Sequence, residues 1–155
     1  MFTRSPLKVL LADPDYNQYL LLKHILQAKC NHYCNLFWHG DRVQCNHALR
    51  SGIYDLAIIE ADIHSQDVLK VNKGNNHHTP IVLMIDGVTR DDAMTASQFG
   101  VLGILDKHHL DEPSLGCYLA CAELFHKGEL GEGFIADVVM LGKHKNLQRP
   151  YTYIH

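Results

Sequence analysis

Short runs rich in apolar residues alternate with longer stretches of mixed polarity along the first 128 residues of the chain. Such runs, each followed by polar residues, are typical of strands buried on both faces of a parallel sheet. The predicted strands are Leu7 to Ala12, Cys34 to His39, Tyr54 to Glu60, Pro80 to Ile85 and Val101 to Leu105.

The stretches between these runs predict helices. Tyr16 to Ala28 is preceded by Asp15, a candidate N-cap. Its apolar residues Leu22, Ile25 and Leu26 form one stripe along a helical surface. The other predicted helices are Asp41 to Gly52 with Gly52 as C-cap, a weakly patterned stretch within His64 to Lys73, Thr89 to Gly100, and Glu112 to Gly128.

Strands that alternate with helices predict an α/β fold, in which an open five-stranded parallel sheet carries helices on both faces. The functional crevice of such a doubly wound, three-layer sheet lies at the carboxyl ends of the strands. The residues that fall there are Asp13, Pro14, Asp15, Glu60, Ile85, Asp86 and Lys107. We expect one domain over residues 1–128, and an extension or linker over residues 129–155 that could include a short helix.

The composition narrows the range of partners. A net charge of -3 over 155 residues lacks the basic excess that contact with nucleic acid or an anionic membrane would require. No apolar run approaches the roughly 20 residues that span a bilayer. Five cysteines, an odd number, predict reduced thiols rather than a disulfide framework. We therefore expect a cytoplasmic protein that contacts neither membrane nor nucleic acid directly.

The strand ends resemble those of a known family, the CheY-like receiver domain of two-component response regulators. The resemblance covers about Pro6 to Gly128 and rests on KVLLADPD, YDLAIIEADI, TPIVLMIDG and FGVLGILDKHH. It implies a flavodoxin-like sheet with strand order 2-1-3-4-5. In that family two acidic residues after the first strand bind magnesium, and an aspartate ending the third strand accepts phosphate. A Ser or Thr ends the fourth strand and a lysine ends the fifth.

The metal-binding positions are only partly retained in this chain. Asp13 matches the first acidic residue, but Pro14 replaces the second and offers no carboxylate. Asp15 could substitute for it, though from a different place on the turn. Because magnesium requires near-ideal octahedral oxygen ligation, losing a carboxylate weakens the site, and we expect no bound magnesium.

The phosphate-handling positions also depart from the family, except for Lys107. Glu60 stands at the phosphoacceptor position, and Ile85 replaces the hydroxyl residue that ends the fourth strand. Ile104 takes the position of the usually aromatic switch residue. We predict that the Glu60 carboxylate contacts Lys107 and holds the domain in one state. The alternative is a solvated carboxylate at a strand end.

These departures predict a degenerate receiver that is not an enzyme and acts independently of phosphorylation. It would serve signal transduction or transcription regulation by binding a protein partner or a second copy, through a surface from about Asp91 to Phe125 that the resemblance implies. One alternative is a phosphorylatable receiver that uses Asp13 and either Asp62 or Glu60 with magnesium. Another is a flavodoxin-like domain that binds a small ligand or a metal.

Three further features admit more than one interpretation. Cys117 and Cys121 share a helical face, which indicates core packing or a thiol face at a partner interface. The segment from Cys121 to Asn146 has a fainter resemblance to the junction between a receiver and a helix-turn-helix output domain. A group of thiols and imidazoles is irregularly spaced, which favours buried or surface roles over zinc; its members are Cys30, His32, Cys34, His39, Cys45 and His47.

Overall fold

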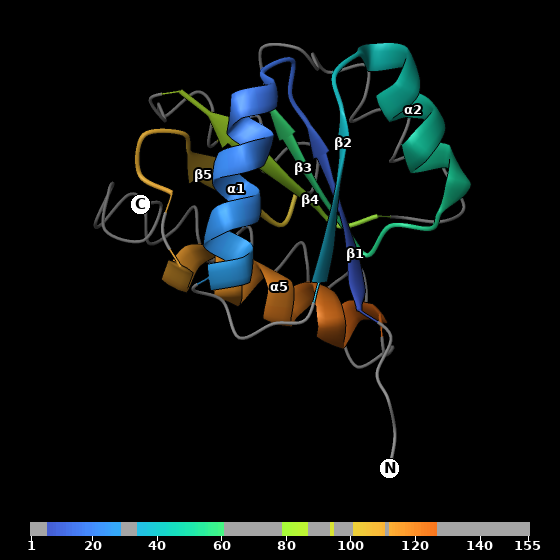
Figure 1. Ribbon diagram of the computed structural model, residues 1–155. Helices are drawn as coiled ribbons and strands as arrows, with labels where there is room; N and C mark the ends of the chain where they lie inside the picture. The colour runs from blue at the N-terminus through green and yellow to red at the C-terminus, as the bar shows by residue number, and fades with distance from the viewer. Residues whose placement is uncertain are drawn as a thin grey trace.

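A parallel five-stranded sheet with strand order β2-β1-β3-β4-β5 forms the centre of the computed structural model (Figure 1). The structure describes residues 6–28, 34–60, 79–86, 94, 101–110 and 112–126. In chain order the elements are β1 (Leu7–Ala12), α1 (Tyr16–Ala28), β2 (Cys34–His39), α2 (Arg42–Ser51), β3 (Leu56–Glu60), β4 (Ile81–Ile85), β5 (Gly103–Asp106) and α5 (Glu112–His126). The predicted α/β fold and its strand order are confirmed.

Local capping explains where the first two helices begin and end. The Asp15 carboxylate accepts a hydrogen bond from the Asn17 backbone N–H at 2.9 Å, as an N-cap does. Asp41 plays the same part for α2 by accepting from Gln44 N at 2.8 Å. Gly52 ends α2 in the left-handed region, with φ of 70°, which favours glycine. Both the Asp15 and the Gly52 predictions are confirmed.

The bounds of the later elements differ from those predicted. The apolar run that begins at Val101 predicted a strand from there to Leu105, but β5 spans Gly103 to Asp106. Val101 and Leu102 are buried before the strand begins, so their apolar character reflects core packing instead of ladder pairing. The strand itself extends through Asp106, because that residue still pairs with Ile85 of β4. The described part of α5 spans Glu112–His126, and its predicted end at Gly128 lies outside the described residues.

The other predicted bounds are close. The strands β3 and β4 begin slightly later than expected, at Leu56 and Ile81. Asp55 is held beside β1 instead, because its N–H donates to the Lys8 carbonyl at 2.7 Å. The helix predicted within 64–73 lies outside the described residues, as does the extension over residues 129–155, and of the helix predicted over 89–100 only Met94 is described, in a helical conformation.

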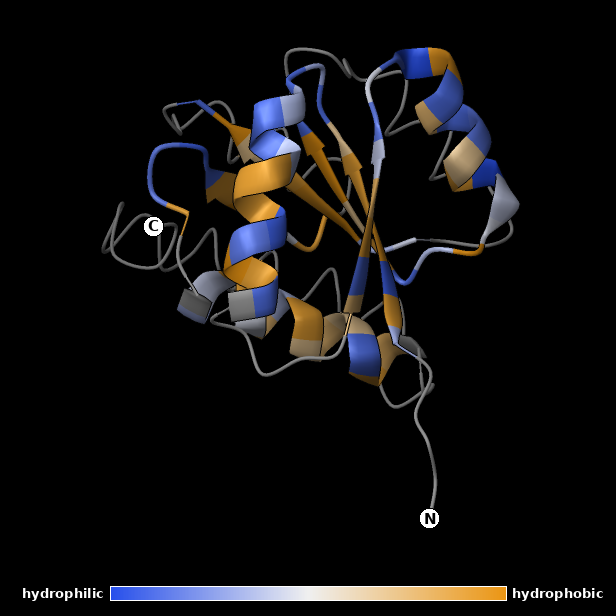
Figure 2. Ribbon diagram, viewed as in Figure 1, coloured by the Kyte–Doolittle hydropathy of each residue, from blue (hydrophilic) through white to orange (hydrophobic). Residues whose placement is uncertain are grey.

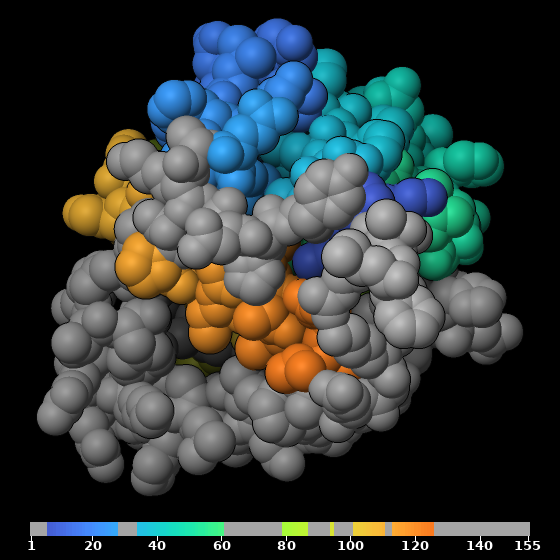
Figure 3. Space-filling model, turned by 60° about the horizontal axis from the view of Figure 1, so that its bottom comes forward, coloured from blue at the N-terminus to red at the C-terminus, as the bar shows by residue number. Residues whose placement is uncertain are grey.

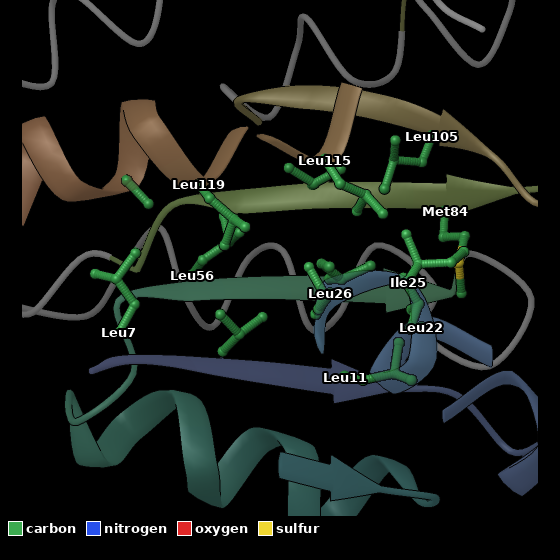
Figure 4. Close-up of a cluster of buried hydrophobic side chains, with 14 of the residues drawn as sticks. Leu7, Leu11, Leu22, Ile25, Leu26, Leu56, Met84, Leu105, Leu115 and Leu119 are labelled. Atoms are coloured by element: carbon green, nitrogen blue, oxygen red, sulfur yellow. The ribbon is translucent and has the colours of Figure 1, made fainter. Parts of the chain in front are cut away.

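Two layers of apolar side chains enclose the sheet. On one face, Cys45, Ala48 and Leu49 of α2 pack against alternate residues of the central strands. On the other, α1 and α5 cover the opposite residues of the same strands, and Figure 4 shows these side chains directed toward one another. The predicted stripe of α1 lies in this second layer, with Leu22, Ile25 and Leu26 all buried.

The hydropathy of each element follows its position. Strands β3 and β4 are hydrophobic along their length in Figure 2, because they lie at the centre of the sheet and are buried on both faces. The helices mix hydrophobic and polar residues, since each covers the sheet with one side only. None of the helices within the described ranges is long and apolar enough to cross a bilayer.

Candidate functional site

The parallel registers bring the carboxyl ends of four strands to the same edge of the sheet. Ala12 of β1 pairs with Ile59 of β3, and Ile85 of β4 pairs with Asp106 of β5. The residues at or directly after these ends are therefore neighbours in space although they lie far apart in the sequence. They form the candidate site, whose centre consists of Asp13, Glu60 and Lys107.

Asp13 is fully buried and held through both its backbone and its side chain. Its backbone N–H donates to the His39 carbonyl at 3.3 Å, and its carbonyl accepts from the Trp38 indole N–H at 2.8 Å. Carboxylate Oδ1 accepts from Asp15 N at 2.8 Å, and Oδ2 lies 3.5 Å from Lys107 Nζ. The position of this carboxylate is thus fixed by contacts from β2, from its own turn and from β5.

The electrostatics at Asp13 are dominated by burial. Loss of hydration raises the pKa of its carboxyl above the ordinary value, more than the Asp15 N–H and the Lys107 ammonium lower it. Oδ2 makes no hydrogen bond within the described part of the chain, although it faces the ammonium. The ionised form of Asp13 is therefore destabilised by desolvation, and the Asp15 N–H and the Lys107 ammonium compensate for only part of that cost.

Glu60 contributes a second buried carboxylate to the same ammonium. It is the last residue of β3 and only 2% exposed, and its Oε1 lies 3.9 Å from Lys107 Nζ. The predicted contact between Glu60 and Lys107 is therefore present. The alternative of a solvated carboxylate at a strand end is wrong, because this side chain is only 3% exposed.

Lys107 connects the two carboxylates across the edge of the sheet. Its backbone N–H donates to the Ile85 carbonyl at 2.9 Å, which continues the β4–β5 pairing one residue past the strand. Its ammonium reaches Asp13 on one side and Glu60 on the other, and the side chain is 22% exposed. Two buried carboxylates share one cation, an arrangement in which each group influences the ionisation of the others.

The other residues predicted for this site do not join its centre. Pro14 and Asp15 are exposed, and the Asp15 carboxylate caps α1 rather than entering the pocket. Ile85 is buried in the apolar layer between α2 and the sheet, and its side chain has no hydrogen-bonding group. Asp86 is exposed and pairs with the His108 imidazole instead of Lys107. The prediction for Asp62 lies outside the described residues.

No protein-family model matches this sequence, and no curated protein does. Solved structures do match. The chain is similar to a response regulator from Hahella chejuensis, with 26% identity, a TM-score of 0.58, and coverage of 66% of this chain and 80% of that one. It is also similar to the chemotaxis response regulator CheY4 of Vibrio cholerae, with 16% identity, a TM-score of 0.63, and coverage of 76% and 99%. This chain has the receiver fold.

A third similar structure supports the same conclusion. The CheY-like response regulator receiver domain protein from Methanospirillum hungatei JF-1 has 12% identity, a TM-score of 0.66, and coverage of 80% of this chain and 99% of that one. The resemblance inferred from the strand ends is thereby confirmed as a likeness of fold. Within the receiver fold, the centre formed by Asp13, Glu60 and Lys107 occupies the crevice that doubly wound sheets use for ligands.

The residues present do not suit the magnesium ion that the receiver fold implies. Pro14 supplies no carboxylate, and the Asp15 carboxylate is engaged at the start of α1. The remaining buried oxygens of Asp13 and Glu60 face an ammonium group at 3.5 and 3.9 Å. No group of three or more His, Cys, Asp or Glu side chains that could hold a metal occurs within the described ranges, which include Cys34, His39, Cys45 and His47.

The switch position of the receiver fold is tied to α5. Ile104 is buried, and its carbonyl accepts a hydrogen bond from the Tyr118 hydroxyl at 3.2 Å. The Tyr118 ring lies directly over Gly103, where a Cβ atom would overlap it. An aromatic side chain therefore contacts this part of β5 from the helix, instead of projecting from the strand itself.

Sequence reasoning missed two residues that organise the site. The Trp38 indole fixes the Asp13 carbonyl, and the apolar character of the β2 run concealed that role. The carboxylate of Asp106, at the end of β5, accepts from His108 N at 2.9 Å and contacts His109 Nδ1 at 3.1 Å. A carboxylate that directly follows an apolar run was the available signal for Asp106, because such a position falls at the functional edge of the sheet.

Proposed function

We propose that this chain is a phosphorylation-independent receiver that acts in signal transduction by protein contact and is not an enzyme. The observation that carries the proposal is the Lys107 ammonium, which lies between the buried carboxylates of Asp13 and Glu60. A permanent ion pair then stands where receivers of the phosphorylated kind undergo a reversible modification.

The geometry of Glu60 argues against a phosphate cycle. Its carboxylate stands one methylene further from the backbone than that of aspartate, and a displacement of about 1 Å can lower a reaction rate ~100-fold. Ile85 offers no hydroxyl to a phosphoryl oxygen at the neighbouring strand end. Opening the pocket for a phosphoryl group would also separate Lys107 from buried carboxylates that have lost their hydration.

The proposed contact surface extends from about Asp91 to Phe125 and includes β5 and α5. Receiver domains act through partner proteins or second copies, and this surface is the one that the family resemblance implies. Within its described part, Leu124 on α5 is an exposed large apolar side chain. Contact with this surface by a partner or by a second copy would carry the signal, and any effect on transcription would then arise through that contact.

The proposed location is the cytoplasm, since an odd number of cysteines suits a reducing compartment.

The test is to offer the protein the reagents that activate a phosphorylatable receiver. Amide NMR spectra would be recorded with magnesium and beryllofluoride, and intact mass would be measured after incubation with acetyl phosphate and magnesium. We expect no shift of the Glu60 and Lys107 signals and no added phosphate. Shifts at Glu60 or Asp62, or a phosphate adduct at either residue, would instead establish the phosphorylatable alternative.

A matched variant makes a negative result informative. Pro14→Asp, Glu60→Asp and Ile85→Thr together restore the carboxylates and the hydroxyl that the receiver resemblance implies. We expect this triple variant to respond to beryllofluoride while the wild-type chain does not. A wild-type response equal to that of the variant would contradict the proposal, because the three substitutions would then be irrelevant to the chemistry.

A further inference from the structure

Helix α5 carries two thiols one turn apart. Cys117 is exposed, and Cys121 is partly buried against the apolar layer that α1 and α5 share with the sheet. They lie four residues apart on one face of the helix, so their side chains are neighbours. Part of α5 reaches the molecular surface in the space-filling view of Figure 3. The pair thus combines a thiol accessible to solvent with a thiol whose position is restrained by packing.

The helix geometry disfavours a disulfide between these residues. Side chains at positions i and i+4 of a helix have Cβ atoms about 5–6 Å apart. A disulfide requires a Cβ separation of about 3.5–4.5 Å, so closing one here would distort the helix. An atom that bridges the two sulfurs has no such requirement, since two metal–sulfur bonds of about 2.3 Å each span a wider gap.

The ionisation of the pair suits a soft cation. The neighbouring Cys121 thiol lowers the pKa of Cys117 to about 6, which favours the thiolate form that binds metal ions. The Cys117 side chain in turn raises the pKa of Cys121. Burial raises the pKa of Cys45 to about 12, which makes that thiol inert by comparison.

We propose that Cys117 and Cys121 form a two-thiolate site for a soft, thiophilic metal or metalloid ion. The ion would bridge the exposed and the restrained sulfur and displace the remaining thiol proton, without oxidation of either. Soft thiolate ligands select ions of this class over magnesium or calcium. The site lies on α5, within the proposed contact surface, but its argument rests on the two thiols alone and not on the proposed function.

Phenylarsine oxide is a direct probe of this geometry, because its trivalent arsenic binds two thiols at once. In water the reagent is a dihydroxide: two arsenic–oxygen bonds break, two arsenic–sulfur bonds form, and the hydroxyl groups leave as two water molecules with the thiol protons. We expect one adduct per chain by intact mass. It should survive excess 2-mercaptoethanol and be released by dithiothreitol.

Single-cysteine variants test whether both sulfurs are needed. Cys117→Ser and Cys121→Ser should each weaken retention of the arsenical at least ~100-fold, since a second attachment point on the same helix acts at high effective concentration. Circular dichroism checks the fold of each variant. Because Cys117 is exposed, its variant decides the question even where Cys121→Ser disturbs the core.

The chain offers a matched control at the same sequence spacing. Cys30 and Cys34 are also four residues apart, but Cys34 begins β2 and Cys30 lies outside the described residues. The double variant Cys30→Ser/Cys34→Ser should retain the arsenical like the wild type. Retention that survives Cys117→Ser, or that disappears in the Cys30/Cys34 variant, would overturn the proposal.

Discussion

The site contains ion pairs of two kinds that differ chiefly in burial. At its centre, Lys107 faces the carboxylates of Asp13 and Glu60, which are 0% and 2% exposed. At its rim, His108 pairs with Asp86, and these side chains are 67% and 60% exposed. Water screens the rim pair but does not reach the central carboxylates. Losing the central contacts should therefore lower the free energy of unfolding more than losing the rim contact. Burial, more than contact distance, determines which pair controls the stability of the domain.

Removing the central cation should produce the largest effect. Lys107→Met removes the cation that two buried carboxylates share, and breaking a buried pair in this way typically lowers the free energy of unfolding by about 3–5 kcal/mol. Urea unfolding followed by circular dichroism at neutral pH measures this loss. Lys23→Met on the exposed surface of α1 is the control; it removes only a cation–π contact with the Tyr19 ring and should change stability by less than about 1 kcal/mol. Equal effects for both lysines would show that the central carboxylates are not buried charges.

Neutralising Asp13 should have a smaller effect of the opposite sign. Because burial raises the pKa of Asp13 in the folded state, its contribution to stability is fully present below the unfolded pKa and is lost as pH rises through the folded pKa. Asp13→Asn keeps an acceptor for Asp15 N and removes the carboxyl group whose ionisation lowers the stability of the folded state. We therefore expect the variant to be more stable than wild type at about pH 7, with the difference shrinking toward about pH 4.

The pH dependence of that difference is the decisive measurement. Unfolding curves of wild type and Asp13→Asn at matched pH values cancel the contributions of all other carboxylates. A variant that is less stable than wild type at neutral pH, with a deficit that grows as pH rises, would mean that Lys107 lowers the pKa of Asp13 more than burial raises it.

The rim pair should give the smallest effect. Asp86→Ala removes the partner of His108 at a position where both side chains are largely hydrated. Exposed pairs of this kind contribute roughly 0–1 kcal/mol, so the unfolding midpoint should shift little and should depend weakly on salt. A loss comparable to that of Lys107→Met would remove the contrast between rim and centre.

The fold could be predicted from the sequence because each strand is a short apolar run that is followed by polar residues. The run at Leu7 to Ala12 and the capped helix before Gly52 depend on neighbours in the chain, so local patterns locate them well. The start of β5 could not be predicted as well from the sequence. Val101 and Leu102 are apolar because they are buried, and burial alone does not distinguish a strand from the segment that enters it.

The centre of the site could be predicted because the edge of a parallel sheet collects whatever follows its strands. Asp13, Glu60 and Lys107 all lie at or directly after strand ends, and a contact between Glu60 and Lys107 was predicted, whereas the second contact of Lys107, with Asp13, was not. The hydrogen bond of Trp38 to Asp13 depends on the β1–β2 register, and that of Tyr118 to Ile104 on the packing of α5. Contacts of this kind join side chains to backbone groups in other elements, which no local pattern encodes.

The indole that donates to the Asp13 carbonyl belongs to the one tryptophan of the chain. It also contacts the Tyr16 ring edge-on, with ring centroids 5.1 Å apart, where α1 begins. Indole emission responds to its hydrogen bonding and surroundings, so the intrinsic fluorescence of this protein originates at the turn beside its buried carboxylate. The molecule therefore carries its own optical reporter, and events at that turn can be followed without attaching a dye.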